Sequence, residues 1–175
     1  YGITDPSDLL PLLAKTQVIV IGPGLGVDEW ANSLLTAVLA MTIPLVIDAD
    51  GLNLLTGQKC RKSSWILTPH PGEAARLLSI TPMEVQIDRY AAVIGLRQRY
   101  EGVCLLKGAG TIVSDENGKL FVCDRGNPGM ASAGMGDILS GIIGGLLAQG
   151  LSLGDAAKAG VYIHAGPEIG VASPK

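Results

Sequence analysis

The feature of this sequence that most limits its fold is the alternation of short apolar runs with segments of helical periodicity. Four such runs span residues 17–21, 45–47, 65–67 and 103–106. Continuous apolar runs of this length are typical of strands buried on both faces of a parallel sheet, because successive apolar side chains point to opposite faces. Helical segments between such strands place helices against the sheet. The alternation predicts an α/β domain with a mainly parallel central sheet and helices on both faces.

Capping and stop signals set the expected helices. They run from Asp28 to just before Pro44, from Thr81 to Tyr100, from Asp137 to Gln149, and from Ser152 toward His164. Thr81 and Glu84 have the spacing of a capping box, and Gly150 is a stop signal. Residues 111–114 and 119–122 flank the turn sequence ENG, which predicts a β-hairpin beside the parallel strands.

Composition excludes several classes of function. The chain has 175 residues, a length that suits one domain, and a net charge of −3, which disfavours a nucleic-acid partner. No apolar stretch approaches the ~18 residues of a membrane span. No secretory signal precedes the first strand, so we expect a cytoplasmic protein. The three cysteines are far apart in sequence and are expected to be buried or incidental thiols.

Polar, glycine-rich loops follow all four predicted strands. Their sequences are GPGLG at 22–26, DADG at 48–51, TPHPG at 68–72 and KGAG at 107–110. The carboxyl ends of parallel strands line one edge of a sheet, and ligands of such folds bind outside that edge. The four loops therefore predict a binding site.

Residues 126–137 form the most informative segment, because small residues lead directly into a helix. Gly134 and Gly136 would leave backbone amides open at the helix N-terminus, where a phosphate or a developing anion is favoured. Asp137 would then accept a proton from a substrate hydroxyl. The alternative interpretation is a tight turn in which Asp137 only caps the helix.

Two further loops are ambiguous from the residues alone. Lys107 and Thr111 suit a nucleotide phosphate or ribose, although a solvated lysine at a strand end is the commoner case. Glu73 could bind Mg²⁺ and His70 a ligand, but the pair is equally typical of an ordinary helix start.

Other familiar motifs are absent or ambiguous. Three further polar residues are ambiguous in the same way: they are common in turns stabilised by a side chain, and they also occur in ligand-binding sites. They are Asp48, Asp50 and Asn53. The glycines of GPGLG lack the third glycine of the dinucleotide fingerprint, because Val27 follows Gly26. A Walker A loop, the GxSxG nucleophile motif and a helical pair of zinc-binding histidines do not occur.

Taken together and in this order, GPGLG, VIDADGLN, LTPHPGE, LLKGAGT and NPGMASAGMGDILSGIIGGLLAQG resemble the ADP- or ATP-dependent NAD(P)H-hydrate dehydratases. These form the carbohydrate-kinase-like branch of the ribokinase-like superfamily. The resemblance extends from about Val18 to His164. It implies a ribokinase-like fold and a repair lyase, which phosphorylates the ring hydroxyl of hydrated NADH or NADPH and then eliminates phosphate.

The resemblance also implies roles for individual residues. Asp137 would be the base, and Gly26, His70 and Asp137 would contact the hydrated dinucleotide. The adenine nucleotide, ADP or ATP, would be held by Lys107, Gly108, Ala109, Gly110, Thr111, Asn127, Gly134 and Gly136. Glu73 stands in the place of the superfamily glutamate that serves Mg²⁺ and phosphates. Ala133 and Met135 depart from the usual residues of the family without removing a backbone amide.

The family pattern has more sequence on either side. We therefore expect residues 1–175 to be one ribokinase-like domain that lacks an N-terminal portion and a C-terminal tail. An epimerase domain, fused or separate, is a partner that the resemblance suggests, and glycines within 138–147 are compatible with a homo-oligomer. Two alternative functions stay open: a kinase of the same superfamily that acts on a vitamin precursor or sugar, and a nucleotide-binding module without catalysis.

Overall fold

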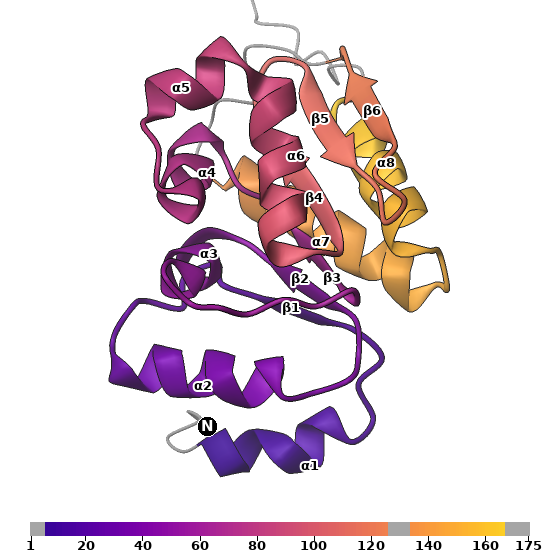
Figure 1. Ribbon diagram of the computed structural model, residues 1–175. Coiled ribbons are helices and arrows are strands. Elements are labelled where there is room, and N and C mark those ends of the chain that lie inside the picture. Colours follow the sequence, from indigo (N-terminus) through magenta and orange to yellow (C-terminus); the bar gives the residue numbers. More distant parts are fainter. Residues whose placement is uncertain (1–5, 126–133, 167–175) are drawn as a thin grey trace, which may run out of the picture.

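The computed structural model describes residues 6–125 and 134–166 as a layered α/β fold (Figure 1). After a 3₁₀ turn at Pro6–Leu9, the elements are α1 Leu10–Leu13, β1 Ile19–Ile21, α2 Glu29–Leu39, β2 Leu45–Ile47, α3 Ala49–Leu55, β3 Trp65–Leu67, α4 Pro71–Leu78, α5 Pro82–Ile87, α6 Arg89–Tyr100, β4 Val103–Leu106, β5 Thr111–Ser114, β6 Leu120–Cys123, α7 Met135–Ala148 and α8 Leu153–His164.

The six strands form one sheet in the order β1-β2-β3-β4-β5-β6. Strands β1 to β4 pair in parallel, with Val20 opposite Val46 and Ile66 opposite Val103. β5 is antiparallel to both of its neighbours, and β5 and β6 form the predicted hairpin. The prediction of a mainly parallel sheet with a β-hairpin is confirmed.

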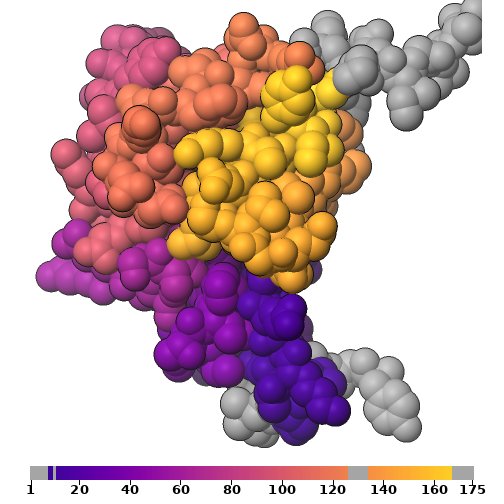
Figure 2. All heavy atoms as spheres, turned by 90° about the vertical axis from the view of Figure 1, so that its right-hand side faces the viewer, coloured from indigo at the N-terminus to yellow at the C-terminus, as the bar shows by residue number. Residues whose placement is uncertain are grey.

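The strand order places the helices in two layers. Because each of the first four strands follows its neighbour in the same direction, right-handed crossovers put α2 to α6 on one face. Leu45, Ile47 and Leu67 belong to the apolar core on that side. The alternate residues Val46 and Ile66 belong to the core on the other face, which α7 and α8 cover. Figure 2 shows these two helices, in yellow and light orange, across the middle of that side.

Burial confirms the apolar runs at three strands and contradicts one. Every residue of β2, β3 and β4 is buried. The first run was expected to be buried on both faces, but β1 is an edge strand, and Val20 is 39% exposed. Among the described residues β1 pairs only with β2, so the run of apolar residues predicted the strand correctly and its burial wrongly.

Two other expectations on local structure were wrong. The helix expected from Thr81 to Tyr100 is two helices, because Asp88 leaves the helical conformation and its carboxylate caps α6 at the amide of Ala91. The loop expected after β2 becomes helical at once, because the Asp48 carboxylate caps α3 at the amide of Ala49. The capping box that starts at Thr81 is confirmed.

All three cysteines are free, with Cys104 and Cys123 buried and Cys60 partly so. Within the two described ranges, none of the helices is both long and apolar enough to cross a membrane.

Candidate functional site

The four loops predicted to form a site meet at the carboxyl edge of the parallel strands. The amide of Gly26 donates to the Asp50 carboxylate at 2.9 Å, which joins the loop after β1 to the first turn of α3. The amide of Lys107 donates to the carbonyl of Pro69 at 2.9 Å, which joins the loops after β3 and β4. Gly22, with φ of 125°, passes so close to the Asp48 carbonyl that a β-carbon would lie 1.8 Å from that oxygen. Only glycine fits there.

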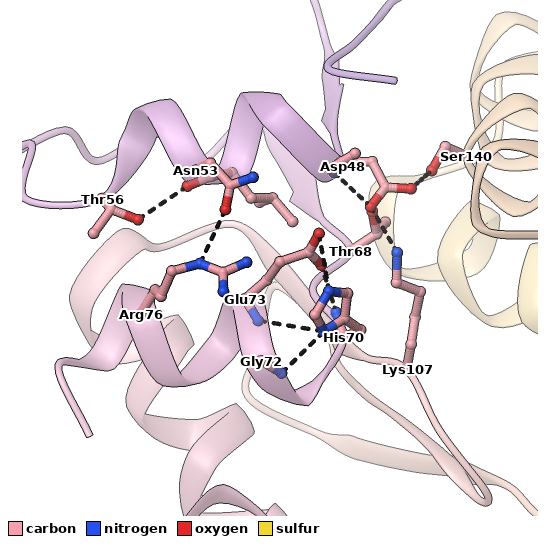
Figure 3. Close-up of polar contacts among 12 residues, drawn as sticks. Asp48, Asn53, Thr56, Thr68, His70, Gly72, Glu73, Arg76, Lys107 and Ser140 are labelled. Atoms are coloured by element: carbon pink, nitrogen blue, oxygen red, sulfur yellow. Dashed lines mark hydrogen bonds and ion pairs between the residues drawn. The ribbon is translucent and has the colours of Figure 1, made fainter. Parts of the chain in front are cut away.

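Asp48 is the central side chain of this edge, and it is fully buried (Figure 3). Its Oδ1 accepts from Lys107 Nζ at 2.7 Å and from the amide of Ala49 at 2.8 Å. Its Oδ2 accepts from Ser140 Oγ at 2.6 Å. A buried carboxylate is tolerated when it has such donors. Asp48 thus connects β2, β4 and α7.

Lys107 points toward the start of α7. A β-carbon added to Gly136 would lie 3.3 Å from Lys107 Nζ. The lysine side chain is only 20% exposed and is paired with Asp48, so it is not the solvated lysine of the simpler interpretation. Its ammonium group therefore lies beside the backbone of the first turn of α7.

A glycine caps the N-terminus of α7, and part of the segment predicted to bind an anion, residues 126–133, lies outside the described residues. Gly134 is the N-cap residue, with φ of 86°, and it has no side chain to occupy the first amides. Asp137 follows in the first turn and is exposed. Because Gly134 takes the cap position, Asp137 is not the N-cap residue, and its proposed role as a base stays a prediction. The glycine cap, the helix dipole and the charge of Lys107 all favour an anion at this point.

His70 and Glu73 form a capping box at the start of α4. His70 Nδ1 accepts from the amides of Gly72 at 2.9 Å and Glu73 at 3.4 Å, and Glu73 Oε2 accepts from the His70 amide at 2.7 Å. The helix-start interpretation is thus confirmed for both residues. His70 Nε2 and Glu73 Oε1 take no part in the capping box. Because Nδ1 is an acceptor, a neutral ring carries its proton on Nε2.

Burial and charge shift the pKa values of both groups. Burial lowers the pKa of His70, and the positive charges of Lys107 and Arg76 lower it further. This keeps the ring neutral and its Nε2 a donor. Burial raises the pKa of Glu73, while the hydrogen bond from the His70 backbone and the charge of Lys107 act in the opposite direction. Glu73 Oε1 lies 3.4 Å from His70 Nε2.

The remaining predicted residues fall into two groups. Gly108, Ala109, Gly110 and Thr111 form the loop after β4, where Thr111 Oγ1 donates to the Gly108 carbonyl at 3.2 Å. The Gly26 amide is already used by Asp50, so Gly26 can offer a ligand only close approach to its α-carbon, around which the space is open. Asn127 lies outside the described residues.

Sequence reasoning missed two residues of this edge. Asp48 was ambiguous between a turn residue and a site residue and was given no role, and Ser140 was not singled out. An aspartate directly after a buried strand is a weak signal, and nothing in the spacing of Ser140 points to it. Among the described residues, no group of three or more His, Cys, Asp or Glu side chains is arranged to hold a metal ion.

Comparison with known proteins agrees with the resemblance of the motifs. A family model described as NAD(P)H-hydrate dehydratase matches residues 3–170. The chain is 59% identical over 164 residues to the bifunctional NAD(P)H-hydrate repair enzyme Nnr of Coxiella burnetii, which aligns 94% of this chain with 34% of that protein. It is 44% identical over 168 residues to the ADP-dependent (S)-NAD(P)H-hydrate dehydratase of Neisseria meningitidis, with 90% of this chain and 57% of that protein aligned.

The same fold occurs in a solved structure. The ADP/ATP-dependent NAD(P)H-hydrate dehydratase from Bacillus subtilis, co-crystallised with ATP and Mg²⁺, has a TM-score of 0.78 and 31% identity, over 85% of this chain and 53% of that one. A ribokinase-like superfamily protein from Enterococcus faecalis has a TM-score of 0.81 and 31% identity, over 91% of this chain and 57% of that one, so the fold is ribokinase-like. The chain spans about a third of the length of the bifunctional relatives. The match over residues 3–170 shows that the chain belongs to the NAD(P)H-hydrate dehydratase family.

Proposed function

We propose that this protein uses ADP or ATP to dehydrate hydrated NADH and NADPH. The observation that carries the proposal is the position of the Lys107 ammonium group beside the N-terminus of α7, the helix whose first turn carries the exposed Asp137. A cation and open amides suit a phosphoryl group in transfer, and a neighbouring carboxylate suits the removal of a hydroxyl proton. Family membership supports the same substrates.

In the first step, Asp137 takes the proton of the ring hydroxyl as its oxygen attacks the terminal phosphorus of the nucleotide. A new phosphorus–oxygen bond forms, the bond to the nucleotide breaks, and AMP or ADP leaves. The amides of Gly134 and Gly136 and the ammonium group of Lys107 stabilise the charge on the phosphoryl oxygens. The carbon–oxygen bond then breaks, phosphate leaves with the bonding electrons, and loss of a proton from the neighbouring ring carbon restores the double bond.

His70 and Glu73 are proposed to serve the ligands from α4. His70 would donate its Nε2 hydrogen to the hydrated dinucleotide, and Gly26 would allow that ligand to approach the loop after β1. Glu73 suits Mg²⁺ carried on nucleotide phosphates, because Oε1 is not needed by the capping box and Mg²⁺ commonly takes one or two carboxylates beside phosphate oxygens. When bound, Mg²⁺ would neutralise phosphate charge.

The nucleotide is proposed to bind over residues 107–111, with Asn127 as a further contact. A cytoplasmic location and an epimerase partner are also proposals. The word bifunctional in the names of several relatives supports a second activity on the same damaged cofactor.

The test is an assay of the full chain with hydrated NADH and ADP. We expect recovery of the absorbance of reduced nicotinamide, with AMP and phosphate released in equal amounts. A stable phosphorylated product without phosphate release would favour a superfamily kinase. Binding of ADP with neither product would favour a non-catalytic module.

Asp137→Asn tests the proposed base within that assay. It should lower turnover by about 10²- to 10⁴-fold, because the hydroxyl proton loses its acceptor. ADP binding, measured by calorimetry, should change less than about twofold, since the nucleotide contacts stay. Unchanged turnover in this variant would remove Asp137 from the role of base.

A further inference from the structure

The loop after β4, Lys107–Thr111, is held from behind by an arginine that belongs to another element. Arg89 is the first residue of α6. Its Nη1 donates to the Ala109 carbonyl at 2.5 Å, and its Nη2 donates to the carbonyls of Leu106 and Lys107, both at 3.3 Å. One guanidinium group thus donates hydrogen bonds to three carbonyls within a stretch of four consecutive residues.

This grip fixes where the amides of the loop point. In a trans peptide the carbonyl and the following amide point in opposite directions. With the carbonyls of Lys107 and Ala109 turned toward Arg89, the amides of Gly108 and Gly110 are turned away from it. Gly108 has φ of 141° and Gly110 has φ of 70°, conformations that glycine adopts without strain. Among the described residues no hydrogen bond is donated by either amide, which suits both amides to bind the oxygen atoms of a ligand.

Arg89 also brings a charge that the protein leaves uncompensated. In the described part of the chain, no carboxylate forms an ion pair with it, and its buried Nε has no hydrogen-bond partner. Gly108 lies against the guanidinium group, since a β-carbon there would be 3.0 Å from Nη2. A partly buried, unpaired cation directly behind open amides raises the positive potential of the loop.

We propose that Arg89 is the positioning residue of the nucleotide loop: it orients the amides of Gly108 and Gly110 toward oxygen atoms of the adenine nucleotide and adds its charge behind them. The inference rests on the proposed function only in that the loop binds a nucleotide. Arg89 acts through the backbone and takes no part in proton transfer.

The chain offers a matched control on the same helix. Arg97 donates from Nε to the Asp115 carbonyl at 3.0 Å and from Nη2 to the Glu116 carbonyl at 2.6 Å. It grips the turn between β5 and β6, at the end of the sheet away from the site. Arg97→Met therefore removes the same kind of contact from the same helix without touching the nucleotide loop.

The experiment titrates ADP by calorimetry into the full chain as wild type, Arg89→Met, Arg89→Lys and Arg97→Met. We expect affinity for ADP to fall roughly tenfold in Arg89→Met and about threefold in Arg89→Lys, and to stay within about twofold in Arg97→Met. In turnover assays the KM for ADP should rise in Arg89→Met, while kcat at saturating ADP stays within about twofold. If Arg89 only stabilised the fold, Arg89→Met and Arg97→Met would change the affinity for ADP to the same extent.

Affinity for ADP in Arg89→Met that matches Arg97→Met would overturn the inference, as would a wild-type protein that does not bind ADP. Should Arg89→Met fail to fold, Arg89→Lys decides: unchanged affinity overturns the proposal and a loss of about threefold supports it. If ADP binds and Arg89 matters but hydrated NADH is never restored, the proposed function fails and this inference stands.

Discussion

Two buried aspartates, at opposite ends of the sheet, are held in similar ways. Asp48 follows β2 and accepts from the amide of Ala49, from Ser140 Oγ and from Lys107 Nζ. Asp115 follows the antiparallel strand β5, so it lies at the other end. It accepts from the amides of Asn117 and Lys119, at 3.0 and 2.8 Å, and from Lys158 Nζ at 3.1 Å. Each site is a lysine–carboxylate pair supported by backbone amides.

The two sites differ in what each lysine contacts besides its aspartate. Lys158 has a second carboxylate, Asp155, at 3.9 Å. Two negative charges therefore compensate one positive charge, and this pair stabilises the hairpin against α8. Lys107 has Asp48 on one side and the N-terminus of α7 on the other. Since a helix N-terminus is itself positive, that arrangement is completed by an anion. The same kind of ion pair is structural in one place and, under the proposed function, half of a binding site in the other.

The largest expected effect on activity comes from replacing each of the two lysines in turn. Lys107→Met should lower kcat/KM for ADP-dependent dehydration by about 10²-fold or more, because the phosphoryl oxygens lose a fixed charge in a partly buried place. Lys158→Met should change kcat/KM less than about twofold, since its charge is already compensated. Steady-state assays of both variants check this. Equal losses in the two would show that Lys107 acts through stability alone.

The next effect concerns the aspartates themselves. Asp48→Asn should reduce kcat/KM roughly tenfold, because Lys107 loses the partner that directs it toward α7. Asp115→Asn should leave kcat/KM unchanged while lowering the melting temperature, as a buried hydrogen-bonded network is weakened. Thermal melts and kinetics on the same samples separate the two results.

Ser140→Ala serves as a milder companion to Asp48→Asn. It removes one hydrogen bond from Asp48 and leaves the ion pair with Lys107 in place. Turnover should stay closer to wild type than in Asp48→Asn. A loss in Ser140→Ala as large as in Asp48→Asn would show that the attachment of α7, rather than the direction of Lys107, limits activity.

Local signals in the sequence predicted most of the fold. Continuous apolar runs identified β2, β3 and β4, and the turn sequence ENG located the hairpin. These features depend on neighbours within a few residues. Two errors have different causes. Asp88 ends one helix and caps the next at the amide of Ala91, so a local signal was overlooked. The burial of β1 depends on which strands pair with it, and among the described residues only β2 does.

The sequence predicted which loops form the candidate site, but it did not predict the side-chain contacts between them. The four loops follow from four strand ends, and the family motifs add the proposed role of Asp137. The bond between Lys107 and Asp48 joins residues 59 positions apart, and the bond from Ser140 spans 92. Nothing in spacing tells which of two aspartates, Asp48 or Asp50, turns inward. Packing decides this, since Asp48 begins a helix over a buried strand and Asp50 reaches the loop after β1.

The smallest effect concerns the acid stability that Asp115 provides. Burial raises the pKa of Asp115, but the amide of Lys119, the ammonium group of Lys158 and the amide of Asn117 lower it by more, so it lies below the usual value of 3.8. A carboxylate with a lowered pKa in the folded state stabilises the protein above its unfolded pKa, and this contribution is lost as the pH falls through the folded value. Urea midpoints of wild type should therefore drop from about pH 5 toward pH 2 more steeply than those of Asp115→Asn, which has no proton to bind there. Parallel curves for the two proteins would show that Asp115 contributes nothing to acid stability, and the comparison with Asp48 would then rest on geometry alone.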